Sequence, residues 1–197
     1  MLNYKSISEK GELIHFKHLS IKSKIPSSYK YEDLGAVDNP YEKMVEIHKL
    51  HNKHNYRNHK YDPEKLAGTF FEITTNNKCF CYITYKNYKN FQKMKLIAVH
   101  EETHALHFLR PDNLERAFMD LYGLKIDIVN KERFFENNDI NIERIANENE
   151  VYPKESIHSE LIARVMTKAY FEKRNWDFEI ESSLDETAQK LYYNLKI

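Results

Sequence analysis

The sequence predicts an α+β fold that is rich in helix and contains a small antiparallel sheet. Two β-rich runs, residues 69–74 and 79–85, flank Asn76 and Asn77, and this pattern is typical of a β-hairpin. A stretch without glycine or proline follows at about residues 92–109, with apolar residues all around the helical wheel, so we expect a buried helix there. The chain contains only 4 glycines and 5 prolines among 197 residues, which favours helices joined by few tight turns.

The segment before the hairpin shows strand signals and then a helix start. Residues 11–25 alternate loosely between apolar and polar side chains, which indicates one or two short strands that end at Pro26. Asp38-Asn39-Pro40 is a good helix start because proline is well accommodated in the first turn. We therefore expect a helix from residue 41 to about residue 55.

Downstream of the buried helix the sequence predicts further helices. Pro111 opens a helix that continues to about residue 122, where Gly123 closes it. Pro153 starts a long helix to about residue 174, with apolar side chains along one side. The remaining parts are a strand or loop at residues 124–129, short helices between residues 130 and 150, and an amphipathic segment at residues 184–195.

Size and composition are those of one ordered domain. At 197 residues and 23.7 kDa the chain can bury a sizeable core. Its 41% apolar and 13% aromatic residues exclude a disordered protein. Basic and acidic residues number 30 each, so the net charge of zero argues against a general surface for nucleic acid or anionic membranes. We expect a single domain over residues 1–197.

The sequence also indicates a compartment. Residues 1–6 are not followed by the apolar segment of a secretory signal, and no stretch reaches the about 18 apolar residues of a membrane span. Cys79 and Cys81 are the only cysteines, and their spacing in a strand places them on one face in poor geometry for a disulfide. We therefore expect reduced cysteines in a cytoplasmic protein.

One motif carries chemistry: His100-Glu101-Glu102-Thr103-His104 has the HExxH spacing. On a helix the two histidines stand one turn apart on one face, where both imidazoles can bind one metal ion. Glu101 lies about 100° further around the helix, so its carboxylate can reach a metal-bound water without binding the metal. Zinc lowers the pKa of that water toward about 7 and polarises a carbonyl, while the glutamate takes the proton. Two histidines and a glutamate on a buried helix need such a partner, and we expect one zinc ion.

The order of these features has a known counterpart. A hairpin that leads into a buried HExxH helix, with a second long helix downstream, resembles the zincin superfamily of metallopeptidases over about residues 68–174. The resemblance implies that His100 and His104 are zinc ligands, that Glu101 is the general base, and that the substrate is a peptide or protein. It also implies that residues 70–85 supply the sheet edge that pairs with an extended substrate. Residues 1–67 would then be an N-terminal extension.

The third zinc ligand distinguishes the branches of this superfamily. The glycine and third histidine that follow the motif in metzincins are absent. His107 shares the face of the two histidines but lies about 7.5 Å along the axis from their midpoint, so we expect it to support or pack against the site. Residues 160–164 resemble the glutamate segment of gluzincins and of ImmA/IrrE-like intracellular peptidases, which implies Glu160 as the third ligand. Its rivals are Glu155, His158 and Glu143.

Two positions depart from the family pattern. Glu102 occupies a motif position that is usually uncharged, and pointing to solvent is its simplest explanation. Arg164 stands where an aspartate often orients a ligand histidine, which leaves that role unassigned. Both departures motivate an alternative function, a zincin scaffold that binds or regulates without cleaving. An accidental motif in a structural or interaction protein is a weaker third hypothesis.

Two other groups of residues leave choices open. Peptide hydrolysis needs a donor for the oxyanion of the tetrahedral intermediate. The candidates are Tyr152, which we prefer, His158 and Tyr170.

Separately, three histidines recur every three residues on the helix expected at residues 41–55, with a fourth just beyond it. A polar face near solvent is preferred over a second metal site for these residues, which are His48, His51, His54 and His59.

Overall fold

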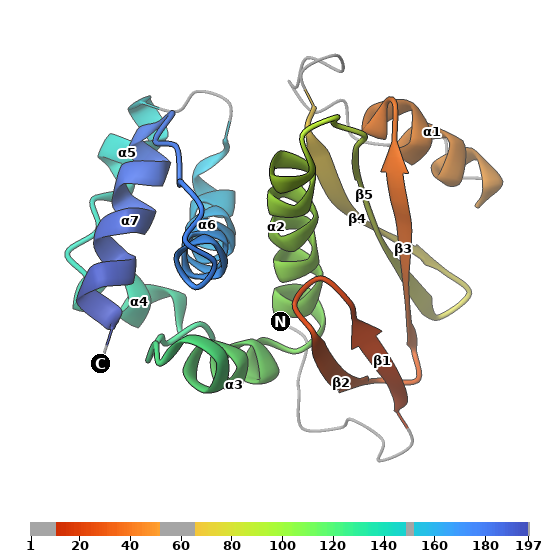
Figure 1. Ribbon diagram of the computed structural model, residues 1–197. Helices are drawn as coiled ribbons and strands as arrows, with labels where there is room; N and C mark the ends of the chain where they lie inside the picture. Colours follow the sequence, from red (N-terminus) through yellow and green to blue (C-terminus); the bar gives the residue numbers. More distant parts are fainter. Residues whose placement is uncertain (1–10, 52–65, 149–151, 197) are drawn as a thin grey trace. The chain divides into compact units, whose positions relative to one another are not determined.

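The computed structural model shows an α+β protein and describes residues 11–51, 66–148 and 152–196 (Figure 1). Within these ranges it has seven α-helices and two small sheets. The chain divides into two compact units, residues 1–105 and residues 106–197, and each unit is described by itself. The α+β class is therefore confirmed, whereas the single domain stays a prediction.

The first unit contains a β-hairpin and a three-stranded sheet. The strand signal at residues 11–25 is confirmed, because β1 (Glu12–Phe16) pairs antiparallel with β2 (Ile21–Ile25). The larger sheet has the order β3-β5-β4. Its strands are β3 (Tyr29–Val37), β4 (Gly68–Thr75) and β5 (Lys78–Lys86).

The predicted hairpin at residues 69–85 is confirmed as the antiparallel pair β4–β5. Asn76 and Asn77 have φ angles of 48° and 61°, and a two-residue turn with both central residues left-handed matches the twist of the strands. Strand β5 is paired on both sides and buried over residues 81–85. Of the two hairpin strands, β4 lies at an edge of the described sheet and β5 does not, so the substrate edge expected over residues 70–85 could come only from β4.

Strand β3 is the element that the sequence did not predict. It pairs parallel with β5, so the larger sheet is mixed and not wholly antiparallel. Its half-buried and exposed residues alternate over residues 29–32, but residues 33–35 are all half-buried and the pairing register shifts between Asp33 and Ala36. Because alternation is the main sequence signal of a strand, so short an alternating run is easily missed.

Two helices of the first unit cover opposite faces of the larger sheet (Figure 1). Met44 and Ile47 of helix α1 (Pro40–Leu50) belong to a hydrophobic cluster with Tyr82 of β5. Ile97 of helix α2 (Phe91–Leu109) belongs to a second cluster with Tyr85 of β5. Tyr82 and Tyr85 are three positions apart on β5, so their side chains project from opposite faces. The sheet is thus a platform for α2, which carries the HExxH motif.

Helix α1 begins where the sequence predicts. The side-chain oxygen of Asn39 accepts hydrogen bonds from two backbone N–H groups of the first turn, at 3.1 and 3.2 Å, and Pro40 occupies the first helical position. The helix ends at Leu50, earlier than the expected end near residue 55. Residues 52–65 lie outside the described part of the chain.

The second unit is built mainly from helices in its described residues. Helix α6 (Ile157–Glu172) is almost entirely buried and packs against α7 (Ser183–Leu195) (Figure 1). The other elements are α3 (Pro111–Tyr122), α4 (Lys131–Asn137), α5 (Ile142–Glu148) and a short 3-10 turn at Lys154–Ser156. The predicted short helices, the long helix and the amphipathic segment are therefore confirmed.

The boundaries in this unit follow local signals. Gly123 closes α3 with a φ of 65°, and its N–H donates to the carbonyl of Met119 at 2.9 Å. The long helix expected from Pro153 starts at Ile157, after the 3-10 turn. Residues 124–129 belong to no named strand and make only an isolated bridge at Leu124. In the described parts of the chain, no helix has the length and apolarity needed to cross a membrane.

Candidate metal centre

The motif helix α2 is buried from its second turn onward. Asn90 caps its start by accepting a hydrogen bond from the N–H of Lys93 at 3.1 Å. Between residues 97 and 105 every side chain is buried except those of the two motif histidines, which are half-buried. The Thr103 hydroxyl within this stretch donates to the Val99 carbonyl at 2.7 Å, which satisfies a polar group that has lost contact with water.

His100 and His104 face each other across one turn of α2. Their Nε2 atoms are 3.0 Å apart, and the two rings lie at 82° with centroids 4.7 Å apart. Two ring nitrogens at this distance direct their lone pairs toward one point, so a proton or a cation is needed between them. The spacing predicted from the motif is thus realised within a single helix.

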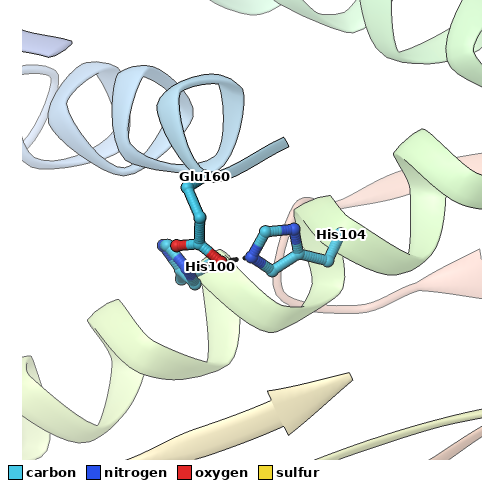
Figure 2. Close-up of side chains that lie close together, drawn as sticks. All are labelled: His100, His104 and Glu160. Carbon is cyan, nitrogen blue, oxygen red and sulfur yellow. Dashed lines mark hydrogen bonds between the residues drawn. The ribbon is translucent and has the colours of Figure 1, made fainter. Parts of the chain in front are cut away.

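Glu160 belongs to the same group of potential ligands. His100, His104 and Glu160 each offer one ligand atom, and these atoms lie within 4.8 Å of one another (Figure 2). The group could therefore hold a metal ion. Two imidazole nitrogens and one carboxylate oxygen are the donor set of His₂Glu zinc sites, in which a fourth position stays open. The residue types fit zinc, although other metals that accept nitrogen and oxygen ligands fit the same set.

The rival third ligands are not in this group. Among the described residues the group contains Glu160 and neither Glu143, Glu155 nor His158. Glu143 and Glu155 are both exposed, and Glu143 forms an ion pair with Lys154. These two carboxylates are surface groups, so of the predicted alternatives Glu160 is the one that belongs to the potential ligand group.

His158 packs with His107 inside the second unit. The two ring centroids are 5.4 Å apart, and the His158 ring also meets Phe134 edge-on at 4.9 Å. Burial, assisted by the charge of Lys131, lowers the pKa of His158 to about 4, so this imidazole is neutral at pH 7. The packing role expected for His107 agrees with this contact. His158 remains a candidate oxyanion donor because its Nε2 has no hydrogen-bond partner among the described residues.

Glu101 lies against the first residue of the edge strand β4. The Glu101 side chain is 7% exposed. A Cβ atom placed on Gly68 would lie 2.7 Å from its Oε1 atom and 2.6 Å from the Ile97 side chain. Only glycine therefore leaves room for this carboxylate. The sequence reasoning assigned no role to Gly68, and its position at the start of a β-rich run was the available signal.

Glu102 does not point to solvent, so that expectation was wrong. Its side chain is completely buried, and it accepts a hydrogen bond from the N–H of Leu19 at 2.6 Å and from the Tyr31 hydroxyl at 3.4 Å. Burial raises the pKa of Glu102 to about 7, against the opposing effect of the hydrogen bonds from the Leu19 and His18 backbone. On the helix Glu102 faces away from the two histidines and holds the β1–β2 turn.

A polar network that the sequence did not reveal continues from this turn. The His18 ring contacts Asp33 at 3.0 Å through Nε2 and the Lys95 ammonium at 2.9 Å through Nδ1. Lys17 also pairs with Asp33 at 2.5 Å. Although burial raises the pKa of Asp33, hydrogen bonds from His18, Lys17 and the Gly35 N–H outweigh it and hold that pKa below its usual value. These residues fasten β3 and the β1–β2 turn beside α2.

Arg164 has its own partners in the second unit. Its Nη1 atom donates to Asp185 Oδ1 at 2.6 Å, and its Nη2 atom donates to the Tyr152 hydroxyl at 3.3 Å. The same Nη2 atom lies 3.9 Å from Glu160 Oε2, one helical turn away on α6. The position at which the family pattern suggests an aspartate is thus occupied by a cation that contacts the predicted third ligand.

The predicted oxyanion donors differ in their surroundings. Tyr152 is half-buried, and its hydroxyl accepts a hydrogen bond from the Arg164 guanidinium, which also lies beside Glu160. Tyr170 is buried under Arg174, whose guanidinium carbon lies 3.5 Å from the ring centre. It is ten residues from Glu160 on the same helix, which corresponds to about 15 Å along the axis. This distance disfavours Tyr170, while the role of Tyr152 stays a prediction.

The histidines of α1 do not form a solvent-facing polar surface, which corrects the preferred interpretation. His48 stacks on Phe71 with centroids 5.6 Å apart, and His51 contacts the Tyr82 hydroxyl at 2.9 Å. Both rings are half-buried because α1 packs on the sheet through this side. The remaining two, His54 and His59, lie outside the described residues.

Cys79 and Cys81 are both free, as expected. They project from the same face of β5. A hydrogen bond from the Cys81 thiol lowers the pKa of Cys79 to about 7, whereas the same contact together with burial raises the pKa of Cys81. The two cysteines are therefore neighbouring thiols that form no disulfide, with Cys81 as hydrogen-bond donor and Cys79 as acceptor.

Comparisons with protein-family models, with curated proteins and with solved structures found no match to this chain. The observations thus define the class at the level of an α+β protein with a potential His₂Glu metal group.

Proposed function

We propose that this chain is a zinc-dependent metallopeptidase with a zincin-like, gluzincin-type catalytic domain. The observation that carries the proposal is the HExxH helix, where the Nε2 atoms of His100 and His104 are 3.0 Å apart and Glu160 belongs to the same potential ligand group. In this proposal His100, His104 and Glu160 hold one zinc ion and leave one position open to water and substrate.

Glu101 serves as the general base in this proposal. A bound zinc ion would supply acidity to a coordinated water and polarise the substrate carbonyl. Glu101 follows His100 directly on α2, and its carboxylate is held in a desolvated position beside Gly68. A carboxylate fixed there can take a proton without first reorganising the surrounding residues. Tyr152 is the proposed donor to the oxyanion.

The proposed substrate is an extended peptide segment. Strand β4 is an edge strand in the described sheet, and such an edge offers backbone N–H and C=O groups to another strand. Gly68, the first residue of β4, adjoins Glu101, so a peptide paired with this edge would run toward the proposed base. The two free cysteines suit a reducing compartment, and we place this activity in the cytoplasm.

Metal content is the first test. Purified protein should contain about one zinc ion per chain by elemental analysis. His100→Ala should lose most of this zinc, because the two ligands that remain cannot hold the ion tightly. His15 is exposed on β1, so His15→Ala is the matched control and should keep its zinc. Unchanged zinc content in His100→Ala would refute the site.

Cleavage of peptide libraries is the second test. Glu101→Gln should retain zinc and lose hydrolysis by about a hundredfold or more, since a positioned general base contributes about 10²–10⁴-fold. Full activity in Glu101→Gln would refute the assignment of the base. A zinc-loaded wild-type protein that cleaves no peptide would instead favour the alternative function, a zincin scaffold that binds or regulates.

A further inference from the structure

Arg164 is held in place by the start of helix α7. Its Nη1 atom donates to Asp185 Oδ1 at 2.6 Å, and the two side chains are only 19% and 9% exposed. Asp185 in turn accepts a hydrogen bond from the Ser182 hydroxyl at 2.7 Å and one from the N–H of Glu181 at 3.2 Å. Because Ser182 is the N-cap of α7, the guanidinium is fixed by the backbone at that helix start.

The fixed guanidinium lies beside Glu160 without binding its oxygens. Glu160 and Arg164 are one turn apart on α6, and the closest approach of their charged groups is 3.9 Å, from Arg164 Nη2 to Glu160 Oε2. This distance is too long for a hydrogen bond but close enough for electrostatic attraction. The guanidinium therefore attracts the carboxylate at short range without a hydrogen bond between them.

We propose that Arg164, anchored by Asp185, is a positioning residue that orients the Glu160 carboxylate for metal binding. The inference rests on the proposed function, because it assigns Glu160 as the third ligand. It gives a role to the position where the family pattern suggests an aspartate, and that role acts on the glutamate ligand and not on a histidine.

A cation near a metal ligand has an unfavourable side, and Asp185 offsets it. The charge of Arg164 would repel a divalent cation bound to Glu160. The Asp185 carboxylate at 2.6 Å neutralises this charge, so the pair acts on Glu160 at short range with little net charge. Asp185 thus both locates the guanidinium and protects metal affinity. Removing Asp185 alone should weaken zinc binding more than removing both partners.

Lys168 provides a matched control on the same helix. It lies one turn beyond Arg164, is 8% exposed, and pairs with Glu172 at 2.7 Å. Its ammonium also lies over the rings of Phe178 and Tyr193, at 5.7 and 5.3 Å from their centres. Substitution of Lys168 therefore disturbs α6 and its surroundings without touching Glu160.

The experiment is a double-mutant cycle on zinc affinity, measured by competition with a chromophoric chelator. Arg164→Met should weaken zinc binding about 10- to 100-fold, the usual cost of losing a group that orients a ligand. In the Glu160→Gln background the same substitution should change affinity less than threefold, or about 0.65 kcal/mol, because the orienting contact has lost its target. Lys168→Met should lower the melting temperature and leave zinc affinity unchanged.

The outcomes separate this inference from the proposed function. If Arg164→Met weakens zinc binding equally with and without Glu160, or behaves like Lys168→Met, then Arg164 only stabilises the packing of α6 against α7. In that case the inference fails while the proposed function stands. If the wild-type protein binds no zinc, the proposed function and the inference fail together. Should Arg164→Met not fold, the cycle is run with Arg164→Lys, which keeps the charge but not the planar fork and is expected to weaken binding in the same way.

Discussion

Replacement of Glu102 by alanine tests the most buried charge next to the candidate site. The substitution removes the acceptor for the Leu19 N–H, which is bonded at 2.6 Å. It also removes the acceptor for the His18 N–H. Leu19 is 2% exposed, so water cannot replace the lost partner. At about 1–3 kcal/mol for each buried donor left without an acceptor, we expect Glu102→Ala to lower the free energy of unfolding by about 2–6 kcal/mol in mildly acidic buffer.

The size of this effect should depend on pH. Burial raises the pKa of Glu102 from 4.5 to about 7, so the folded protein binds the proton more tightly than the unfolded chain does. The stabilisation from this proton is fully present below about pH 4.5 and is lost as the pH rises through about 7. A difference of about 2.5 between the two pKa values corresponds to about 3 kcal/mol. The wild type should lose about this much stability between these limits, whereas Glu102→Ala should not.

Urea unfolding followed by circular dichroism, with a chelator present in every sample, measures both effects. The destabilisation by Glu102→Ala should be largest near pH 5 and about 3 kcal/mol smaller near pH 8. Glu136 is exposed on α4 and offers a control, since Glu136→Ala should change stability by less than about 0.5 kcal/mol. A loss below about 1 kcal/mol near pH 5, or a loss that is the same at both pH values, would show that Glu102 does not hold the β1–β2 turn.

Three further substitutions test other contacts. Gly68→Ala should reduce peptide hydrolysis about tenfold or more with unchanged zinc content, because its Cβ would meet Glu101 Oε1 at 2.7 Å; equal activity would refute the close approach. Asp33→Asn should lower the free energy of unfolding at neutral pH, because it removes the ionised carboxylate that contacts His18. The pKa of Asp33 lies below its usual value of 3.8, so this stabilisation is fully present above about pH 4 and is lost as the pH falls further. The difference from wild type should therefore narrow below about pH 4. Denaturant curves that stay equally separated in acid would contradict this. Gly123→Ala should cost about 1 kcal/mol in thermal unfolding because φ is 65° there, and an unchanged melting temperature would argue against this helix end.

Much of the fold follows from short-range sequence signals. The hairpin turn at Asn76 and Asn77, the cap at Asn39 and the helix end at Gly123 each depend on residues within a few positions. Such signals were sufficient because turn and cap conformations are determined by local backbone preferences. Strand β3 was missed since its pairing with β5 depends on residues such as Cys79, about fifty positions further along the chain.

The surroundings of the charged residues could not be predicted in this way. Glu102 was expected at the surface, but the N–H that it accepts from lies 83 residues earlier in the sequence. Arg164 looked like a departure from a family pattern, and its partner Asp185 lies 21 residues later. Gly68 had no predicted role, and its closeness to Glu101 is visible only in the folded chain. In each case the partner comes from a segment that only folding brings near.

The α+β class, the hairpin and the buried helix follow from the sequence alone, as does the position of His100 and His104 one turn apart on that helix. They do so because helical periodicity and turn chemistry are properties of neighbouring residues. Other features are visible only in the folded chain. Glu102 is buried, the group that could hold a metal ion contains Glu160 and neither Glu143 nor Glu155, and Arg164 lies beside Glu160. These features depend on which distant segments pack together, because a buried charge must find its partner wherever the fold provides one.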